Sequence, residues 1–168
     1  METLFSNLST YNVLNFIFPG ATMCYAARYF LGLKLPTELS MLSELLLYYF
    51  VGLTISRIAT LFVEYFCRET KLIVYADYSD YLYAEKVDAK IAVLNEQNNS
   101  YRNFLTVFII IAILKFKRDI NFTTMVADWD VDTWIIIGFI SLFALSYRKQ
   151  TNYIRKRVLS ICKDRGDK

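Results

Sequence analysis

The sequence predicts an all-α fold, a polytopic helical membrane protein with about four transmembrane helices and a helical cytosolic linker between the second and third. Apolar residues make up 55% of the 168 residues and the mean hydropathy is +0.30, both high for a soluble domain. Aromatic residues reach 17%, and a chain this short cannot build a soluble core large enough to bury them. We therefore expect lipid to surround much of a single compact unit.

The first apolar segment covers residues 11–33 and is expected to span the membrane. Pro19 and Gly20 lie inside it, so a kink or a break is expected there. Asn12 and Asn15 recur with small residues at helical spacing, which predicts a face that packs against another helix.

The second span, Met41–Phe66, is longer than a hydrocarbon core of ~30 Å requires. It contains Arg57, and an intramembrane arginine costs about 2.5–3.5 kcal/mol, so it should face water or a partner. The polar strip around it predicts either a pore lining in an oligomer or an Arg57–Glu64 pair that locks helices near the inner interface. The strip consists of Ser56, Arg57, Thr60 and Glu64. Gly52 begins a series of small residues four apart, a pattern typical of close helix packing.

Residues 67–103 are polar and nearly balanced in charge, with five basic and six acidic residues. Apolar positions from Val87 to Leu94 recur at helical spacing opposite Glu85 and Asp88, which predicts an amphipathic cytosolic helix. The basic and tyrosine side chains form a candidate ligand face, with interfacial or packed tyrosines as the alternative. The candidate face consists of Arg68, Lys71, Tyr75, Tyr78, Tyr81, Lys86, Lys90 and Arg102.

Residues 104–114 and 134–146 are the third and fourth apolar runs, and each is short for a full span. Aromatic rings and lysine amines at their ends can extend them into the interfaces. A re-entrant hairpin is the alternative arrangement.

From Arg148 onward the chain holds eight basic and two acidic residues, a net charge of +6 against +3 for the whole sequence. Such a tail is expected in the cytoplasm, and the count of Lys and Arg places the N-terminus there as well. A basic amphipathic helix on the anionic lipid bilayer is the expected structure, and nucleic-acid phosphate is the alternative partner. The expected lipid contacts are Arg155, Lys156 and Arg157.

Histidine is absent and the three cysteines form no CxxC pair. Histidine-based catalysis is therefore excluded, and a zinc or disulfide framework is not expected. The chain contains no phosphate-binding glycine loop, dinucleotide fingerprint or nucleophile elbow. We expect no enzyme activity, no metal and no cofactor.

The predicted divisions are a first helix pair (1–66), the linker (67–103), a second helix pair (104–147) and the basic tail (148–168).

Three stretches within residues 48–104 read YYFVGLTISRIATLFVEYF, YSDYLYAEKVDAKIAVL and NNSYRNF. With little outside loop and a helical cytosolic insert, this layout resembles the small membrane effectors of bacterial anti-phage defence, and the Hailong effectors in particular. The resemblance is one of architecture and covers most of the chain, with no site carried over. It implies a homo-oligomeric, ion-conducting effector of the bacterial inner membrane that is lethal when open. It also implies cytoplasmic control by an oligonucleotide that a partner nucleotidyltransferase makes.

A second hypothesis belongs to a different class of protein. In it, the chain is a non-conducting membrane sensor or anchor that recruits a cytosolic partner protein through its linker. A pore would depolarise the membrane, whereas an anchor would leave the membrane potential unchanged.

Overall fold

The computed structural model describes residues 13–34, 40–119 and 130–166, and every element within them is helical. Asn12, one of the expected packing residues, lies outside the described residues. The elements in chain order are the π-helical η1 (Val13–Ile17), α3 (Phe18–Leu31), α4 (Met41–Ile58), the π-helical η2 (Ala59–Glu64), α5 (Tyr65–Glu69), α6 (Tyr78–Val87), α7 (Lys90–Asp119) and α8 (Val131–Gly166).

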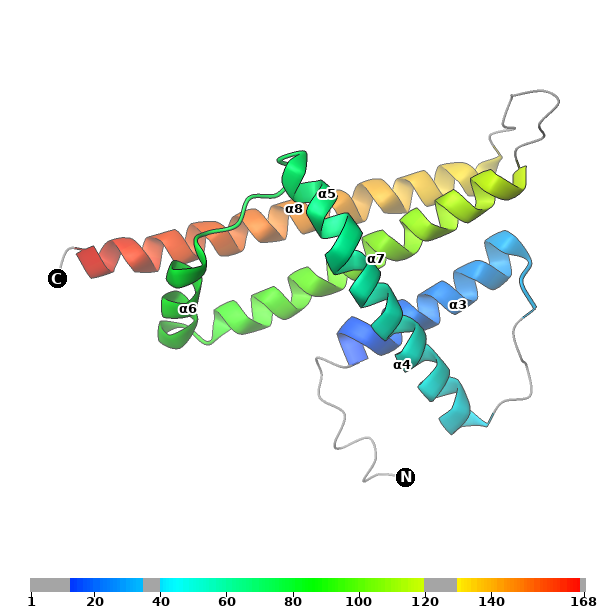
Figure 1. Ribbon diagram of the computed structural model, residues 1–168, viewed down its shortest axis with the longest axis horizontal. Helices are drawn as coiled ribbons and strands as arrows, with labels where there is room; N and C mark the ends of the chain where they lie inside the picture. The colour runs from blue at the N-terminus through cyan, green and yellow to red at the C-terminus, as the bar shows by residue number, and fades with distance from the viewer. Residues whose placement is uncertain (1–12, 35–39, 120–129, 167–168) are drawn as a thin grey trace.

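The antiparallel helices α7 and α8 form the long axis of the molecule (Figure 1). Four phenylalanines stack between them in the apolar part of the pair. Ring centroids are 5.1 Å apart for Phe104 and Phe143, and 4.5 Å apart for Phe108 and Phe139. Because stacked rings add about 0.5–1.5 kcal/mol each beyond their buried area, these contacts help to fix the register of the two helices.

The helix η1–α3 packs against α7, and α4 crosses it at close range (Figure 1). A Cβ atom added to Gly20 would lie 1.8 Å from the carbonyl oxygen of Tyr48, and one on Gly52 would lie 1.8 Å from that of Phe16. Only glycine allows this approach, so the backbone of α4 is in direct contact with those of η1 and α3. Gly52, one of the expected packing residues, lies at this contact.

The irregularity expected at Pro19 and Gly20 lies just before the proline, where η1 is π-helical and leads into α3. Because Pro19 has no N–H, it cannot donate to the carbonyl of Asn15 four residues earlier. The side-chain amide of Asn103 in α7 donates to that carbonyl at 2.8 Å. The proline therefore helps to join the first helix to α7.

Among the residues that the structure describes, three helical segments are long and apolar enough to cross a membrane, namely Met41–Glu69, Lys90–Arg118 and Val131–Lys163. The expected count of four spans is not confirmed, because the first predicted span, 11–33, is not among them. Within it, η1 and α3 have 5 and 14 residues and include the polar Asn15 and Arg28. Membrane class is thus supported, with three candidate spans.

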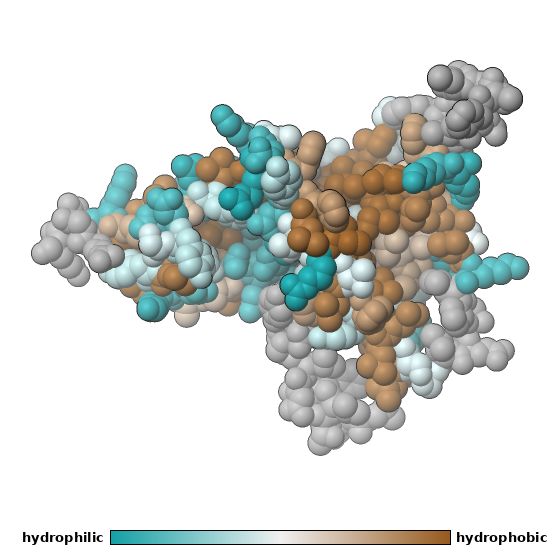
Figure 2. Space-filling view, viewed as in Figure 1, coloured by the Kyte–Doolittle hydropathy of each residue, from teal (hydrophilic) through white to brown (hydrophobic). Residues whose placement is uncertain are grey.

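The molecule divides into two lobes of opposite surface character. We define the apolar lobe as residues 13–31, 41–66, 104–118 and 131–147, and the polar lobe as residues 67–103 and 148–166. Figure 2 shows hydrophobic side chains gathered over the apolar lobe and hydrophilic ones over the polar lobe. Phe50 and Phe62 of the apolar lobe are 71% and 66% exposed. Because a soluble monomer rarely exposes so many large apolar side chains, this lobe is suited to contact lipid or further copies.

The linker does not form one separate amphipathic helix. A short α6 ends at Val87, and α7 begins at Lys90 and continues across the expected boundary at residue 103 without a break. Helix α8 likewise crosses the expected boundary at residue 147. Neither boundary carries glycine or proline, so nothing in the backbone stops the helix, and what changes there is only the polarity of the side chains.

Candidate functional site

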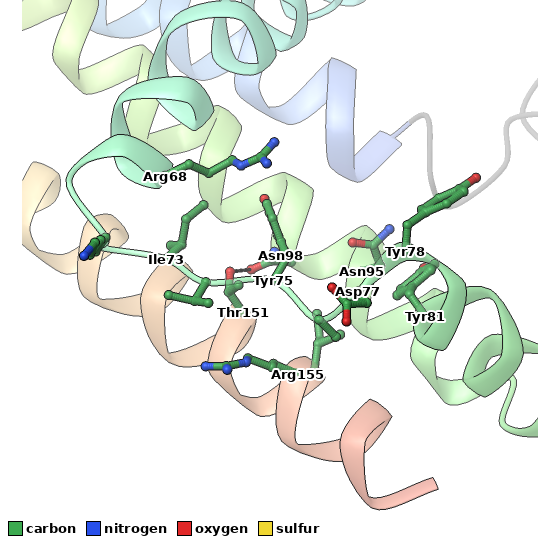
Figure 3. A pocket seen from close by; sticks show the side chains of 14 residues that line it. Arg68, Ile73, Tyr75, Asp77, Tyr78, Tyr81, Asn95, Asn98, Thr151 and Arg155 are labelled. Carbon is green, nitrogen blue, oxygen red and sulfur yellow. Dashed lines mark hydrogen bonds between the residues drawn. The ribbon is translucent and has the colours of Figure 1, made fainter. Parts of the chain in front are cut away.

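The polar lobe contains a cavity of about 890 Å³ beside the chain segment that joins α5 to α6 (Figure 3). We call it the linker cavity. Its walls come from that segment, from α6, and from the polar halves of α7 and α8. Its volume lies in the range of small-molecule sites, which is about 300–1,000 Å³.

Three basic side chains line the linker cavity, Arg68, Lys71 and Arg155, against one acidic side chain, Asp77. Arg68 and Arg155 lie on opposite sides of Tyr75 in Figure 3. All three basic residues are exposed, so their charges are available to an incoming ligand. This excess of positive charge favours an anion, and arginine in particular suits phosphate or carboxylate oxygens.

Three tyrosines line the same cavity, Tyr75, Tyr78 and Tyr81. The guanidinium carbon of Arg68 lies 5.8 Å from the centre of the Tyr75 ring. Burial raises the pKa of both Tyr75 and Tyr81 to about 12, and the carboxylates of Glu64 and Glu85 respectively add to the rise. Both phenols are therefore neutral at physiological pH, and they offer ring faces and hydroxyl groups rather than charge.

The helices α7 and α8 supply polar groups to the wall of the cavity. Asn95 and Asn98 come from α7 and Thr151 from α8. The Thr151 hydroxyl donates to the Asn98 side-chain oxygen at 3.2 Å, and both residues are buried. This bond fixes the spacing of the two helices where they border the cavity.

A second polar cluster lies where the two lobes meet, and we call it the polar junction. Its members are Asn15, Glu64, Tyr75, Arg102, Asn103 and Tyr147. Arg102 donates to and forms an ion pair with Glu64, and their side chains are only 11% and 18% exposed. The hydroxyls of Tyr75 and Tyr147 are 2.7 Å apart. Because Tyr75 belongs to both groups of residues, it connects the linker cavity directly to the polar junction.

The polar junction contains two buried polar atoms without a hydrogen-bond partner, Nε of Arg102 and Oδ1 of Asn103. Each such atom costs about 1–3 kcal/mol when it is removed from water without a replacement bond. The junction is therefore held together by strong bonds and carries a penalty at the same time.

The structure brings five residues of the predicted ligand face together and separates the other three. Arg68, Lys71, Tyr75, Tyr78 and Tyr81 line the linker cavity. Lys86 and Lys90 are exposed but do not line it. Arg102 is buried against Glu64 and is not part of the exposed face.

The polar strip of the second span is also divided. Glu64 pairs with Arg102 of α7, so the Arg57–Glu64 pair that the sequence left open is not formed. Arg57 is exposed on α4 and makes no ion pair with any residue that the structure describes. Ser56 is half-buried, and the hydroxyl of exposed Thr60 donates to the Ser56 carbonyl at 3.0 Å.

The three expected lipid-contact residues lie in three different environments. Arg155 lines the linker cavity. Arg157 donates to Asp88 at 2.6 Å and holds the end of α6 against α8. Lys156 lines a different groove, on another face of α8.

Sequence reasoning missed Asn95, Asn98, Thr151 and Tyr147. For the two residues on α8 the signal that could have found them is spacing, because 147, 151, 154 and 158 recur at alternating steps of four and three residues. Residues at such spacing share one helix face. That face could be assigned to α7 only if the two helices were known to be antiparallel neighbours.

Comparisons of the chain with models of protein families, with curated proteins and with solved structures found no match. In the described ranges, no group of three or more His, Cys, Asp or Glu side chains is placed to hold a metal ion.

Proposed function

We propose that the chain is a homo-oligomeric membrane pore, an effector that depolarises the membrane when a cytosolic ligand no longer holds it closed. The observation that carries this proposal is the position of Tyr75, which lines the linker cavity and also bonds Tyr147 in the polar junction. Tyr75 also lies within the electrostatic reach of Glu64 and Arg102. A ligand that contacts Tyr75 can therefore act on the ion pair between Glu64 of η2 and Arg102 of α7. A ligand shifts an equilibrium only by its difference in affinity for the two states. A residue shared by both clusters lets the ligand sense the state of the junction.

Arg57 supports a conducting oligomer. Its charge lies inside a candidate span, on an exposed face and without an ion pair among the described residues. A guanidinium in hydrocarbon requires water or a partner. In an oligomer the faces that carry Arg57 and Thr60 can surround a common aqueous path. Only 22% of the apolar stretch of Met41–Glu69 and 11% of that of Val131–Lys163 is buried, which leaves ample surface for neighbouring copies.

The ligand that fits the linker cavity is an anion with flat rings. Arginine and lysine neutralise phosphate, and tyrosine rings stack on nucleobases. We therefore propose a nucleotide or short oligonucleotide as the ligand, in the bacterial inner membrane with the polar lobe and the C-terminus in the cytoplasm. The positive charge of the tail and the resemblance to anti-phage effectors support this placement.

The test of conduction is a membrane-potential dye reading in bacteria that express the chain. We expect wild-type protein to depolarise cells on induction, and Arg57→Leu to change the size of the effect by at least about tenfold. The matched control is Arg28→Leu, which removes an exposed arginine near the end of α3 and should behave as wild type. Full membrane insertion without any depolarisation would overturn the pore and favour the anchor.

The test of ligand control is binding of a fluorescently labelled short oligonucleotide to the purified protein in nanodiscs. We expect Arg68→Gln or Arg155→Gln to weaken binding about tenfold, because each removes one charge-assisted contact. Lys86→Gln removes an equal charge outside the cavity and should change the affinity less than about twofold. Equal losses in all three variants would show that binding follows net charge and not the cavity.

The non-conducting anchor is the alternative, because the linker cavity could recruit a soluble partner whether or not the chain conducts ions. In that case the ligand would bind, the variants of Arg68 and Arg155 would lose it, and the membrane potential would not change.

A further inference from the structure

A second groove lies on a different face of α8 and shares no lining residue with the linker cavity. Its volume is about 930 Å³, and it is formed by Tyr101 of α7 together with the part of α8 between Leu145 and Lys156. It extends across residue 147, where α8 passes from the apolar lobe to the polar lobe. We call it the interfacial groove.

Positive charge in the interfacial groove is not compensated by the protein. Arg148, Lys149 and Lys156 line it, and no acidic residue does. None of the three makes an ion pair with a residue that the structure describes. The adjacent Arg157, in contrast, is paired with Asp88. The charges in the groove are therefore available to an anion, whereas the neighbouring one is already neutralised.

Apolar and aromatic side chains border the same charges. Leu145 is 63% exposed and Tyr153 is 50% exposed, and Tyr101 faces them from α7. Residues 145, 149, 153 and 156 recur at steps of three and four, so they lie along one face of α8. Along this face an apolar side chain is followed by cations, with tyrosines beside them. A phospholipid presents the matching order at a membrane surface, where acyl chains are followed by phosphates.

We propose that the interfacial groove binds one anionic phospholipid, with Arg148 and Lys149 on its phosphate and Leu145 against the start of an acyl chain. A free phosphate would satisfy the cations alone. The lipid is favoured because the groove continues into the exposed apolar surface of α8, where Leu142 and Leu145 are 55% and 63% exposed. The proposal does not depend on conduction or on the linker cavity.

The test is native mass spectrometry of the full chain released from detergent, with phosphatidylglycerol or phosphatidylcholine added at matched concentration. We expect phosphatidylglycerol to bind at least about tenfold more tightly. The double variant Arg148→Gln/Lys149→Gln should lose at least about tenfold of that affinity. The control Lys86→Gln/Lys90→Gln removes the same charge from exposed positions of the polar lobe and should lose less than about twofold.

Two further measurements distinguish a lipid from free phosphate and identify variants that have misfolded. Leu145→Gln keeps every cation but removes the apolar contact. It should therefore weaken the binding of phosphatidylglycerol and leave any binding of inorganic phosphate unchanged. Far-UV circular dichroism selects variants that retain helix. Equal affinity for both lipids, equal loss in the two double variants, or competition by inorganic phosphate at millimolar concentration would each overturn the proposal.

Discussion

The two lobes of this protein are built on the same pair of helices and solve opposite packing problems. In the polar lobe, Ala84, Ile91, Ile154 and Val158 close into a small buried cluster, each at most 7% exposed. In the apolar lobe, large side chains such as Leu61 point outward and are 67% exposed. The difference shows that the environment, and not the helix, decides where apolar side chains lie: α7 and α8 each carry both arrangements within one unbroken helix.

The boundary between the lobes carries the polar side chains that neither environment accommodates well. Glu64, Arg102 and Asn103 are buried or nearly so at the polar junction. Charged side chains with so little exposed surface are poorly hydrated, so they need a partner within the protein. We therefore expect the junction to be the part of the molecule most sensitive to substitution, above the core of the polar lobe.

The largest expected effect is the loss of Arg102. Arg102→Ala leaves Glu64 without its partner, and an uncompensated buried charge costs about 3–5 kcal/mol. Thermal unfolding in a mild detergent measures the loss. The double variant Glu64→Gln/Arg102→Met should recover part of it, because no charge is then left unpaired. Lys86→Ala, which removes an exposed cation, is the control. If Arg102→Ala lost as little stability as this control, the junction would be hydrated.

The next largest effect contrasts the two lobes directly. Ile91→Ala removes a fully buried side chain from the polar-lobe cluster and should cost about 2–4 kcal/mol. Leu61→Ala in the apolar lobe should cost less than about 1 kcal/mol in detergent, because that side chain is already outside. Unfolding midpoints of the two variants check the difference. Similar losses at both positions would mean that Leu61 is covered, for example by a second copy of the chain.

A smaller effect tests the contact between α3 and α4. Gly20→Ala places a methyl group against the Tyr48 carbonyl, so the helices must separate, at a cost of about 1–3 kcal/mol. Gly138→Ala is the matched control, because nothing lies within 4 Å of the added atom. It should be neutral or stabilising by up to about 1 kcal/mol, since alanine is the better helix former. If both variants behaved alike, the backbones of α3 and α4 would not be in contact.

The sequence predicts the helical class and a long apolar second helix because both depend on local pattern. Periodicity and hydropathy are sufficient to expect a helix over Met41–Phe66, where α4, η2 and α5 continue from Met41 to Glu69. The tyrosines and cations between Arg68 and Tyr81 are close in sequence, so any compact linker brings them near one another.

Contacts between distant segments could not be predicted in the same way. Glu64 and Arg102 are 38 residues apart, and Asn15 and Asn103 are 88 apart. Helical spacing tells which residues share a face but not which faces meet. The Arg57–Glu64 pair, one of the two alternatives that the sequence leaves open, considers one helix alone, whereas the partner of Glu64 comes from α7. Arg102 shows the same limit, because its charge favours a ligand-facing position in the sequence, whereas the structure buries it against Glu64.

The smallest expected effect concerns the bond that links the linker cavity to the polar junction. Tyr75→Phe removes the hydroxyl that lies 2.7 Å from that of Tyr147 and should cost about 1 kcal/mol at pH 8. The pKa of Tyr75 is raised from 10.0 to about 12, so the folded protein holds this proton more tightly than the unfolded chain does. The contribution of Tyr75 to stability is therefore complete below pH 10 and is lost as the pH rises from 10 to 12. Unfolding of wild type and variant across this range should show the gap between them closing. The result against this link would be a difference in unfolding free energy that stays constant with pH, together with wild-type oligonucleotide binding by Tyr75→Phe. Tyr75 would then line the cavity without coupling it to the polar junction.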